Sequence, residues 1–235
     1  MQVRHLAIDG SIVSLEADSF DLSLPVTATG WAVVPVLAQA HPFSTHPSGY
    51  ASLLEAAARE VGNIEMQSDD EYALKGGTLR VVTVESQTSV GTTRQLAVGA
   101  WDDGKGCLTT SLVSATAERV AAVFDSLEFS SRELGVAIDG RVTARPRAPE
   151  VIKEIPGVGV TSIRPVTSDE LRRLPRSAGA RTAGGEAFRI KVESDAVVVL
   201  TETSIVDVMP VEGSDRDEVT AFVGELRIDW ASRPA

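Results

Sequence analysis

The stretch GGTLRVVTVES, residues 76–86, decides the fold, because a second version of it, GGEAFRIKVES, occurs at residues 184–194. The two align without a gap, with five identities and with apolar residues opposed at several other positions. Each is a β-branched run that starts at a Gly-Gly turn, as is typical of strands in antiparallel hairpins. The runs RQLAVGAW (94–101), CLTTSLV (107–113) and AVVVLTETSIV (196–206) have the same character. The sequence therefore predicts the same set of meandering strands twice.

A helix is predicted after each set of strands. ERVAAVFDSLEFS (118–130) aligns with DEVTAFVGELRID (217–229). Thr116 and Ser214 are the predicted N-caps, and acidic residues follow in the first turn, where the helix dipole favours them. Apolar residues recur at i, i+3, i+4 and i+7, the spacing of one helix face: Val120, Val123, Phe124 and Leu127, then Val219, Phe222, Val223 and Leu226.

The segments upstream repeat in the same order. AIDG occurs at 7–10 and again at 137–140, and both copies continue to a strand that ends at a Pro-Val pair. A further helix is expected over 50–61, and Pro175 is expected to break its counterpart. We therefore expect an α+β fold, an antiparallel sheet flanked by helices, with two pseudo-two-fold-related halves, 1–132 and 133–235, in one structural unit. Chance similarity between hairpin-plus-helix sequences is the alternative to duplication.

Composition narrows the classes of partner. The formal net charge is −11 at pH 7, which opposes binding to nucleic acid or an anionic membrane. One cysteine, Cys107, allows no intrachain disulfide and no multi-cysteine zinc site. The opening MQVRHLAIDG has no apolar leader, so we expect a soluble cytoplasmic protein, a monomer or homodimer, without a metal or cofactor.

The stretch GAWDDGKG (99–106) partly matches the phosphate-binding pattern G-x-x-x-x-G-K-[ST]. Gly106 stands where the pattern needs a hydroxyl, two aspartates would repel phosphate, and a strand rather than a helix follows. Asp103-Gly104 instead predicts the type I′ turn of a β-hairpin. Trp101 at this turn is expected to be exposed and able to contact a partner, or else to cap the sheet.

Three other features could carry chemistry. His41 and His46 lie in HPFSTHP, part of a segment (37–49) absent from the second half, which predicts a surface loop more readily than a metal site. Cys107 follows the turn in a strand, so an unreactive, half-buried thiol is favoured over a catalytic nucleophile. The acidic group 69–71 predicts a solvated turn, since it lacks the spacing of a calcium loop.

A basic segment stands out in this acidic chain. Its arginines could contact an acidic partner or an acidic face of the protein itself, but such a segment is usually just a solvent-exposed loop. The arginines are Arg172, Arg173, Arg176 and Arg181.

The order of these elements resembles the EspG family of chaperones associated with ESX (type VII) secretion in actinobacteria. The resemblance rests on LAIDGSIVSLEADSFDLSLPV (6–26) and on 76–127, which holds a Gly-Gly strand with an Arg, a second strand, an Asp-Gly turn, a third strand and a helix. It implies a central antiparallel sheet with two quasi-symmetric halves. It also implies a non-catalytic cytosolic protein that keeps helical secretion substrates of the PE/PPE type soluble.

A second resemblance is to PsbP/Mog1-like α+β domains, on FDLSLPVTATGWAVVPV (20–36) and VFDSLEFS (123–130). An immunity-type binding protein and a small hydrolase are further alternatives. We expect no catalytic residues and a chaperone or adaptor for a helical protein, with asymmetry of the two halves at the contact site. The predicted contact residues come from the hairpin tip and the 37–49 segment: Trp101, Asp102, Asp103, Lys105, His41, Phe43 and His46.

Overall fold

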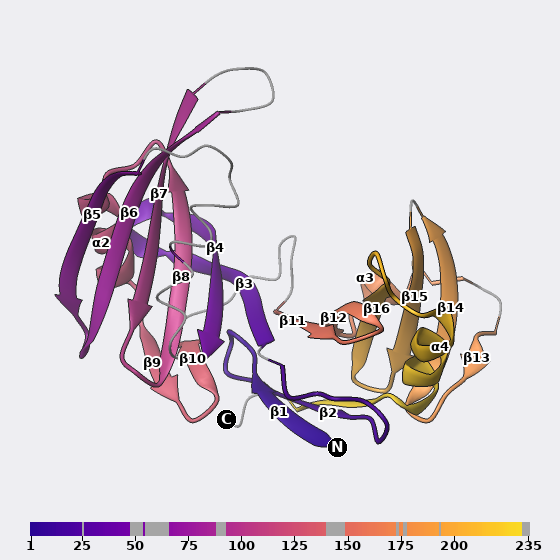
Figure 1. Cartoon of the computed structure of the whole chain (residues 1–235). Helices are drawn as coiled ribbons and strands as arrows, with labels where there is room; N and C mark the ends of the chain where they lie inside the picture. Colours follow the sequence, from indigo (N-terminus) through magenta and orange to yellow (C-terminus); the bar gives the residue numbers. More distant parts are fainter. Residues whose placement is uncertain are drawn as a thin grey trace. The chain divides into compact units, whose positions relative to one another are not determined.

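The computed structural model describes residues 1–24, 26–47, 54, 66–87, 93–139, 149–172, 174–175, 178–192 and 194–231. The chain forms two compact units (Figure 1). We call Met1–Ala28 with Ala148–Ala235 the terminal unit, and Thr29–Arg147 the central unit. The division into compact units rests on contacts within the structure, whereas the halves 1–132 and 133–235 rest on repeated sequence segments. The division into these two halves stays a prediction.

The central unit is a sheet in the order β3-β4-β8-β7-β6-β5, with helix α2 against β6 and β7 and a small β9-β10 hairpin (Figure 1). Strand β3 begins in the terminal unit and continues into this one. The elements are β3 (Val26–Val34), the 3₁₀ turn η1 (Pro35–Leu37), β4 (Gln39–Pro47), β5 (Met66–Leu74), β6 (Gly77–Gln87), β7 (Thr93–Asp102), β8 (Gly106–Val113), α2 (Ala117–Ser126), β9 (Phe129–Arg132) and β10 (Gly135–Ile138).

The terminal unit has a sheet in the order β13-β14-β15-β16-β12-β11 and a three-stranded sheet β1-β2-β17. The β1-β2 hairpin turns at AIDG (7–10). The elements are β1 (Gln2–Leu6), β2 (Ile12–Glu16), β11 (Glu150–Ile155), β12 (Gly159–Pro165), α3 (Ser168–Leu171), β13 (Ala180–Arg181), β14 (Gly185–Val192), β15 (Ser194–Thr201), β16 (Ser204–Met209), α4 (Arg216–Glu225) and β17 (Arg227–Ala231).

Among the described residues the fold is mostly β, with twelve strands in the large antiparallel sheets of the two units, five in the two small sheets, and two ten-residue helices, α2 and α4. The expected antiparallel sheet is therefore confirmed, while helix content is lower than an α+β label suggests. The helix expected over 50–61 lies outside the described residues except Leu54, which is helical and buried. Its expected counterpart is short: α3 has four residues.

The two units order their strands in the same way. In the central unit, β4 pairs with β8, the last strand of the β5–β8 meander, and α2 follows. In the terminal unit, β12 pairs with β16, the last strand of the β13–β16 meander, and α4 follows. Each unit thus has a meander that returns to an earlier strand and ends in a helix.

The helix caps follow the sequence closely. Thr116 caps α2 as predicted, with its side chain accepting from the Arg119 backbone N–H at 3.4 Å. The cap of α4 is Asp215 rather than the predicted Ser214, and its carboxylate accepts from the N–H groups of Asp217 and Glu218. Aspartate and serine cap equally well, so local pattern alone could not choose between adjacent residues.

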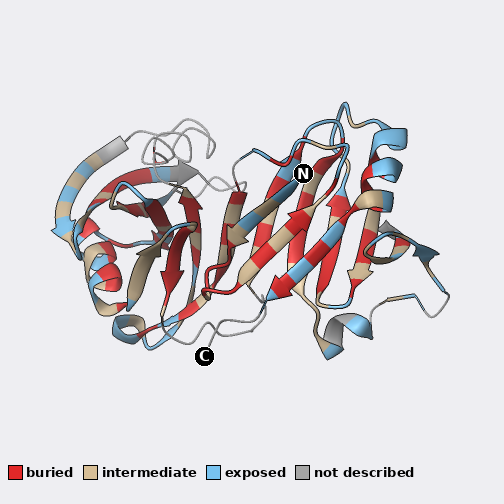
Figure 2. Cartoon of the chain, turned by 90° about the horizontal axis from the view of Figure 1, so that it is seen from below, coloured by how far each residue is buried: buried red, intermediate tan, exposed pale blue. Residues whose placement is uncertain are grey.

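Strand alternation and the helix stripes build the core (Figure 2). Phe222 on α4 is fully buried and meets Phe20 edge to face, with ring centroids 5.2 Å apart. Phe222 belongs to a cluster of buried apolar side chains that all lie in the terminal unit. Among them are Val13, Leu15, Val26, Val151, Ile155, Ile163, Val206, Val208, Val219, Leu226 and Trp230.

Candidate binding groove

The predicted hairpin tip is confirmed as the turn between β7 and β8. The Asp102 carboxylate accepts the Gly104 backbone N–H at 2.6 Å, and the Asp103 carboxylate accepts that of Lys105 at 2.9 Å. The two aspartates therefore stabilise the turn and leave no anion-binding loop there. The type I′ assignment was wrong, because among the turn residues only Gly104, with φ of 83°, adopts the left-handed region.

Trp101 is buried, with 2% of its surface exposed, so the expectation that it is exposed was wrong. Its indole N–H donates to the Leu74 carbonyl at 2.7 Å, and its ring meets Phe129 edge to face at 4.8 Å. The alternative interpretation, that Trp101 caps the sheet, agrees with these contacts. Trp101 shares a face of β7 with Gly99, which lies against Val120 of α2. The indole therefore lies on the side of the sheet that the helix covers.

His41, Phe43 and His46 lie in strand β4, not in a surface loop. The loop prediction was wrong because pairing with β8, distant in sequence, outweighs the prolines; His46 sits opposite Cys107. His41 Nε2 lies 2.9 Å from the Ser111 carbonyl oxygen, whereas Phe43 and His46 are buried. Burial lowers the pKa of His46 to about 4.

The alternative that His41 and His46 share a metal site does not fit their placement in β4. Successive side chains alternate across a strand, so residues 41 and 46 project from opposite faces. No group of three potential metal ligands occurs among the described residues.

Cys107 is more deeply buried than predicted, with no exposed surface. Burial, and then the charge of Asp102, raises the pKa of its thiol to about 12. The thiolate needed for nucleophilic attack is therefore disfavoured at neutral pH.

The acidic group 69–71 forms part of edge strand β5 and is not the predicted turn. Arg80 Nε on β6 donates to Asp69 Oδ1 at 2.7 Å, and hydrogen bonding from Arg80 lowers the pKa of Asp69. Asp69 and Glu71 share one face of β5 and Asp70 projects from the other, so the three carboxylates do not converge on one cation.

A groove in the terminal unit lies between α4 and the β13–β15 part of the sheet, with a volume of about 420 Å³. One face of α4 forms a wall along its length, with residues spaced i, i+3, i+4, i+7 and i+8. The lining consists of Ala180, Arg181, Thr182, Ala187, Phe188, Arg189, Val197, Pro210, Ser214, Arg216, Val219, Thr220, Val223 and Gly224. We call this surface the α4 groove.

The α4 groove is apolar at its floor and basic at its rim. Val219 and Val223 of α4 are buried at its floor, and Ala187 and Val197 of the sheet are partly buried against the same cluster. Its charged lining residues are all arginines: Arg181 on β13, Arg189 on β14 and Arg216 on α4. All three are exposed, in a chain whose net charge is −11. The charged side chains that line the apolar floor are therefore opposite in sign to the net charge of the chain.

The corresponding space in the central unit is filled. Leu79 on β6 lies opposite Trp101 on β7, and both are buried. The next pair on that face is Val81 and Gly99. A Cβ built on Gly99 would lie 2.5 Å from Val120 of α2, so the helix packs directly on the sheet there.

Smaller or polar side chains occupy the matching positions of the terminal unit. The gapless alignment of 76–86 with 184–194 places Ala187 at the position of Leu79 and Arg189 at that of Val81. The strand register then places Val199 opposite Ala187 and Val197 opposite Arg189. With alanine and valine in place of leucine and tryptophan, the sheet leaves space beside α4. This substitution explains why one unit has a groove where the other has a packed core.

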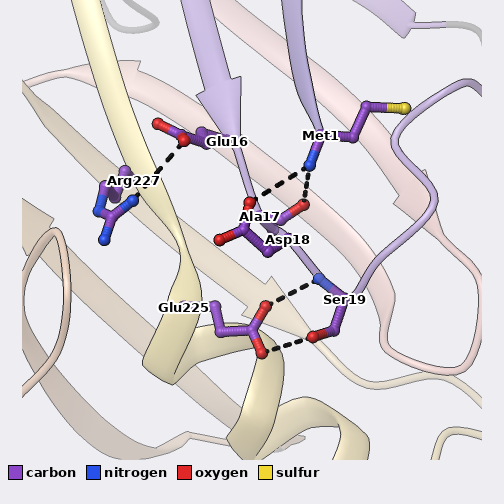
Figure 3. A network of polar contacts seen from close by, with 7 residues as sticks. All are labelled: Met1, Glu16, Ala17, Asp18, Ser19, Glu225 and Arg227. Carbon is purple, nitrogen blue, oxygen red and sulfur yellow. Dashed lines mark hydrogen bonds and ion pairs between the residues drawn. The ribbon is translucent and has the colours of Figure 1, made fainter.

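Hydrogen bonds hold α4 at both ends. At its start, the Asp215 backbone N–H donates to the Gly157 carbonyl at 2.9 Å. At its end, the Glu225 carboxylate accepts from the Ser19 backbone N–H at 3.0 Å and from the Ser19 hydroxyl at 2.8 Å (Figure 3). These bonds lower the pKa of Glu225.

Three further contacts lie near this end of α4. The Ala183 backbone N–H donates to the Gly224 carbonyl at 3.0 Å, which ties the β13-β14 turn to the helix. Arg227 pairs with Glu16 at 3.6 Å, and the Met1 amino group donates to the Ala17 carbonyl at 2.7 Å (Figure 3). The groove wall is thus fixed in place, which lowers the entropic cost of binding.

Sequence reasoning missed most of the α4 groove. The basic segment did point toward it through Arg181, whereas Arg172 is exposed and outside the lining, and Arg173 and Arg176 lie outside the described residues. Aligning 184–194 with 76–86 position by position supplies the missing signal, since Ala187 and Arg189 stand where the other segment has the buried Leu79 and Val81.

Comparison with known proteins gives no relative: no protein-family model, curated protein or solved structure matches the chain. Among the described residues, no helix has the length and apolar character needed to span a membrane.

Proposed function

We propose that this protein is a non-catalytic cytoplasmic chaperone or adaptor that binds a helical segment of another protein in the α4 groove. The observation that carries the proposal is the groove itself, an apolar channel with basic sides on a protein surface. Apolar grooves of this kind accept the apolar face of an amphipathic helix, which inserts side chains at i, i+3, i+4 and i+7.

The shape of the groove supports a helical occupant. Its lining residues on α4 run from Arg216 to Gly224, a rise of about 12 Å at 1.5 Å per residue. Two turns of a partner helix lying beside α4 would match that length. The partner helix would then pack against α4 on one side and against apolar side chains of the sheet on the other.

The resemblance to the EspG family suggests the class of partner. On that resemblance, the partner is a helical secretion substrate of the PE/PPE type, kept soluble until it reaches a type VII secretion machinery. We further propose that the two units descend from an internal duplication. The repeated sequence segments and the shared order of hairpin, meander and helix support this history. Divergence after duplication would have opened the groove in the terminal unit only.

A photo-crosslinking experiment tests the proposal. A benzoylphenylalanine residue replaces Thr220, an exposed residue of α4 that lines the groove, and in a matched control it replaces Val113, which is 58% exposed on the central unit. In cells of the native host, crosslinking from position 220 alone to a protein segment that is helical when made as a peptide would support it. Equal crosslinking from both positions, or a crosslinked segment without helical character, would count against it.

A further inference from the structure

We infer that the α4 groove selects helices whose apolar stripe is flanked by carboxylates. The inference rests on the proposed function and adds to it the charge of the partner. It follows from three arginines on three different elements that surround one apolar floor.

The three guanidinium groups are available to a partner. No hydrogen bond or ion pair joins the side chains of Arg181, Arg189 or Arg216 to any other residue in the part of the chain that the structure describes. Other arginines are used internally: Arg80 pairs with Asp69, and Arg132 pairs with Asp139 at 3.1 Å. A planar guanidinium binds a carboxylate with two parallel hydrogen bonds, which gives direction as well as attraction.

Neither helix stability nor strand packing accounts for two of these arginines. Arg216 is the first residue of α4, where the positive end of the helix dipole disfavours a cation. Arg189 stands on the helix-facing side of β14, at the position that buried Val81 occupies in the aligned copy. Both therefore carry charge where the fold alone favours a carboxylate or an apolar side chain.

The overall charge restricts the partner further. A polyanion such as duplex DNA or an anionic bilayer meets the repulsion of the whole chain, with its net charge of −11. A helix with a few carboxylates next to an apolar stripe places each charge near an arginine and adds little long-range repulsion. The groove chemistry therefore favours an acidic amphipathic helix.

Two synthetic peptides test this on the full chain. Both have 18 residues with leucines at i, i+3, i+4 and i+7; one carries glutamates beside this stripe, and the other carries lysines. Fluorescence anisotropy gives each Kd at low and at physiological salt. We expect the glutamate peptide to bind about tenfold tighter, and the difference to shrink as salt rises, because exposed ion pairs are screened.

Charge reversal identifies the residues responsible. In the Arg181→Glu, Arg189→Glu double variant the preference should invert. The Arg4→Glu, Arg172→Glu double variant is the matched control: it changes the net charge equally, at two exposed positions outside the groove lining, and should leave the preference unchanged. Filling the floor with Ala187→Leu should weaken both peptides, and circular dichroism checks that each variant is folded.

The outcomes distinguish the charge selectivity of the groove from the proposed binding of a helix. Binding of both peptides with equal Kd would overturn the charge selectivity and leave the groove as a helix site. Binding of neither peptide would contradict the proposed function itself. Preferential binding of a duplex DNA probe or of vesicles of anionic lipid would overturn both.

Discussion

Cys107, His46 and Lys153 show how individual side chains in this protein respond to burial. The thiol has no exposed surface, and His46 has 8%. Lys153 is 1% exposed, and its ammonium group donates to the Leu24 carbonyl. Burial disfavours the charged form of each group, so the pKa of the thiol rises while the pKa values of the two base types fall.

We predict that Cys107 does not react with Ellman's reagent in the native protein at pH 8. With its pKa raised to about 12 and its sulfur buried, both thiolate and access are lacking. Absorbance at 412 nm should rise only after unfolding in urea. Val113→Cys, at an exposed position, serves as the control and should react within minutes. A native Cys107 that reacts as fast as this control would contradict the prediction.

Acid should destabilise the protein through His5 and His46. Burial, and for His5 also the charge of Lys153, lowers each pKa to about 4, against 6.5 in the unfolded chain. Between these values the folded state binds fewer protons, so the free energy of unfolding falls as pH drops from 7 toward 4.

For both histidines together, we expect a loss of about 2 kcal/mol at pH 5, after discounting for partial exposure. Urea denaturation at pH 7 and pH 5 measures it, and the His5→Gln, His46→Gln double variant should show a smaller change. An unchanged pH dependence in that variant would show that other groups are responsible.

At the scale of elements, the contrast between α2 and α4 follows from the side chains beneath each helix. Gly99 lets α2 approach β7, whereas Gly224, in the last turn of α4, has no atom within 4 Å of where its Cβ would be. One glycine therefore serves close packing, and the other only costs conformational entropy.

Two alanine substitutions should consequently have opposite effects on stability. Gly99→Ala places a methyl group against Val120, and we expect a loss of about 1–3 kcal/mol through overpacking. Gly224→Ala should gain about 0.4–1 kcal/mol by restricting the unfolded chain. Urea denaturation curves provide both values, and a neutral Gly99→Ala would mean that α2 shifts without cost.

On the scale of the whole molecule, each unit has apolar side chains enough for its own core. The cluster around Phe222 contains only terminal-unit residues. In the central unit, Phe124 is fully buried and meets the rings of Phe43 and Phe129, each with a centroid distance of 6.3 Å.

We therefore expect the units to respond separately to core mutations. Variants that keep only Trp230 or only Trp101 report on the terminal and central units, respectively. Phe222→Ala should lower the stability reported by Trp230 by about 3–5 kcal/mol and affect the Trp101 signal much less, and Phe124→Ala should do the reverse. Equal shifts of both fluorescence transitions would indicate one cooperative body instead.

By itself, the sequence determined the strands β6, β7 and β8, the tip between β7 and β8, and the two capped helices. These elements depend on local signals: β-branched alternation, an Asp-Gly turn and the i, i+3, i+4, i+7 stripe. Only the tertiary structure decided that His46 belongs to a strand, because its pairing partner Cys107 is remote in sequence. It likewise decided that Trp101 is covered and that Ala187 leaves a groove, because both depend on the size of side chains brought together across strands and helices, which no local pattern encodes.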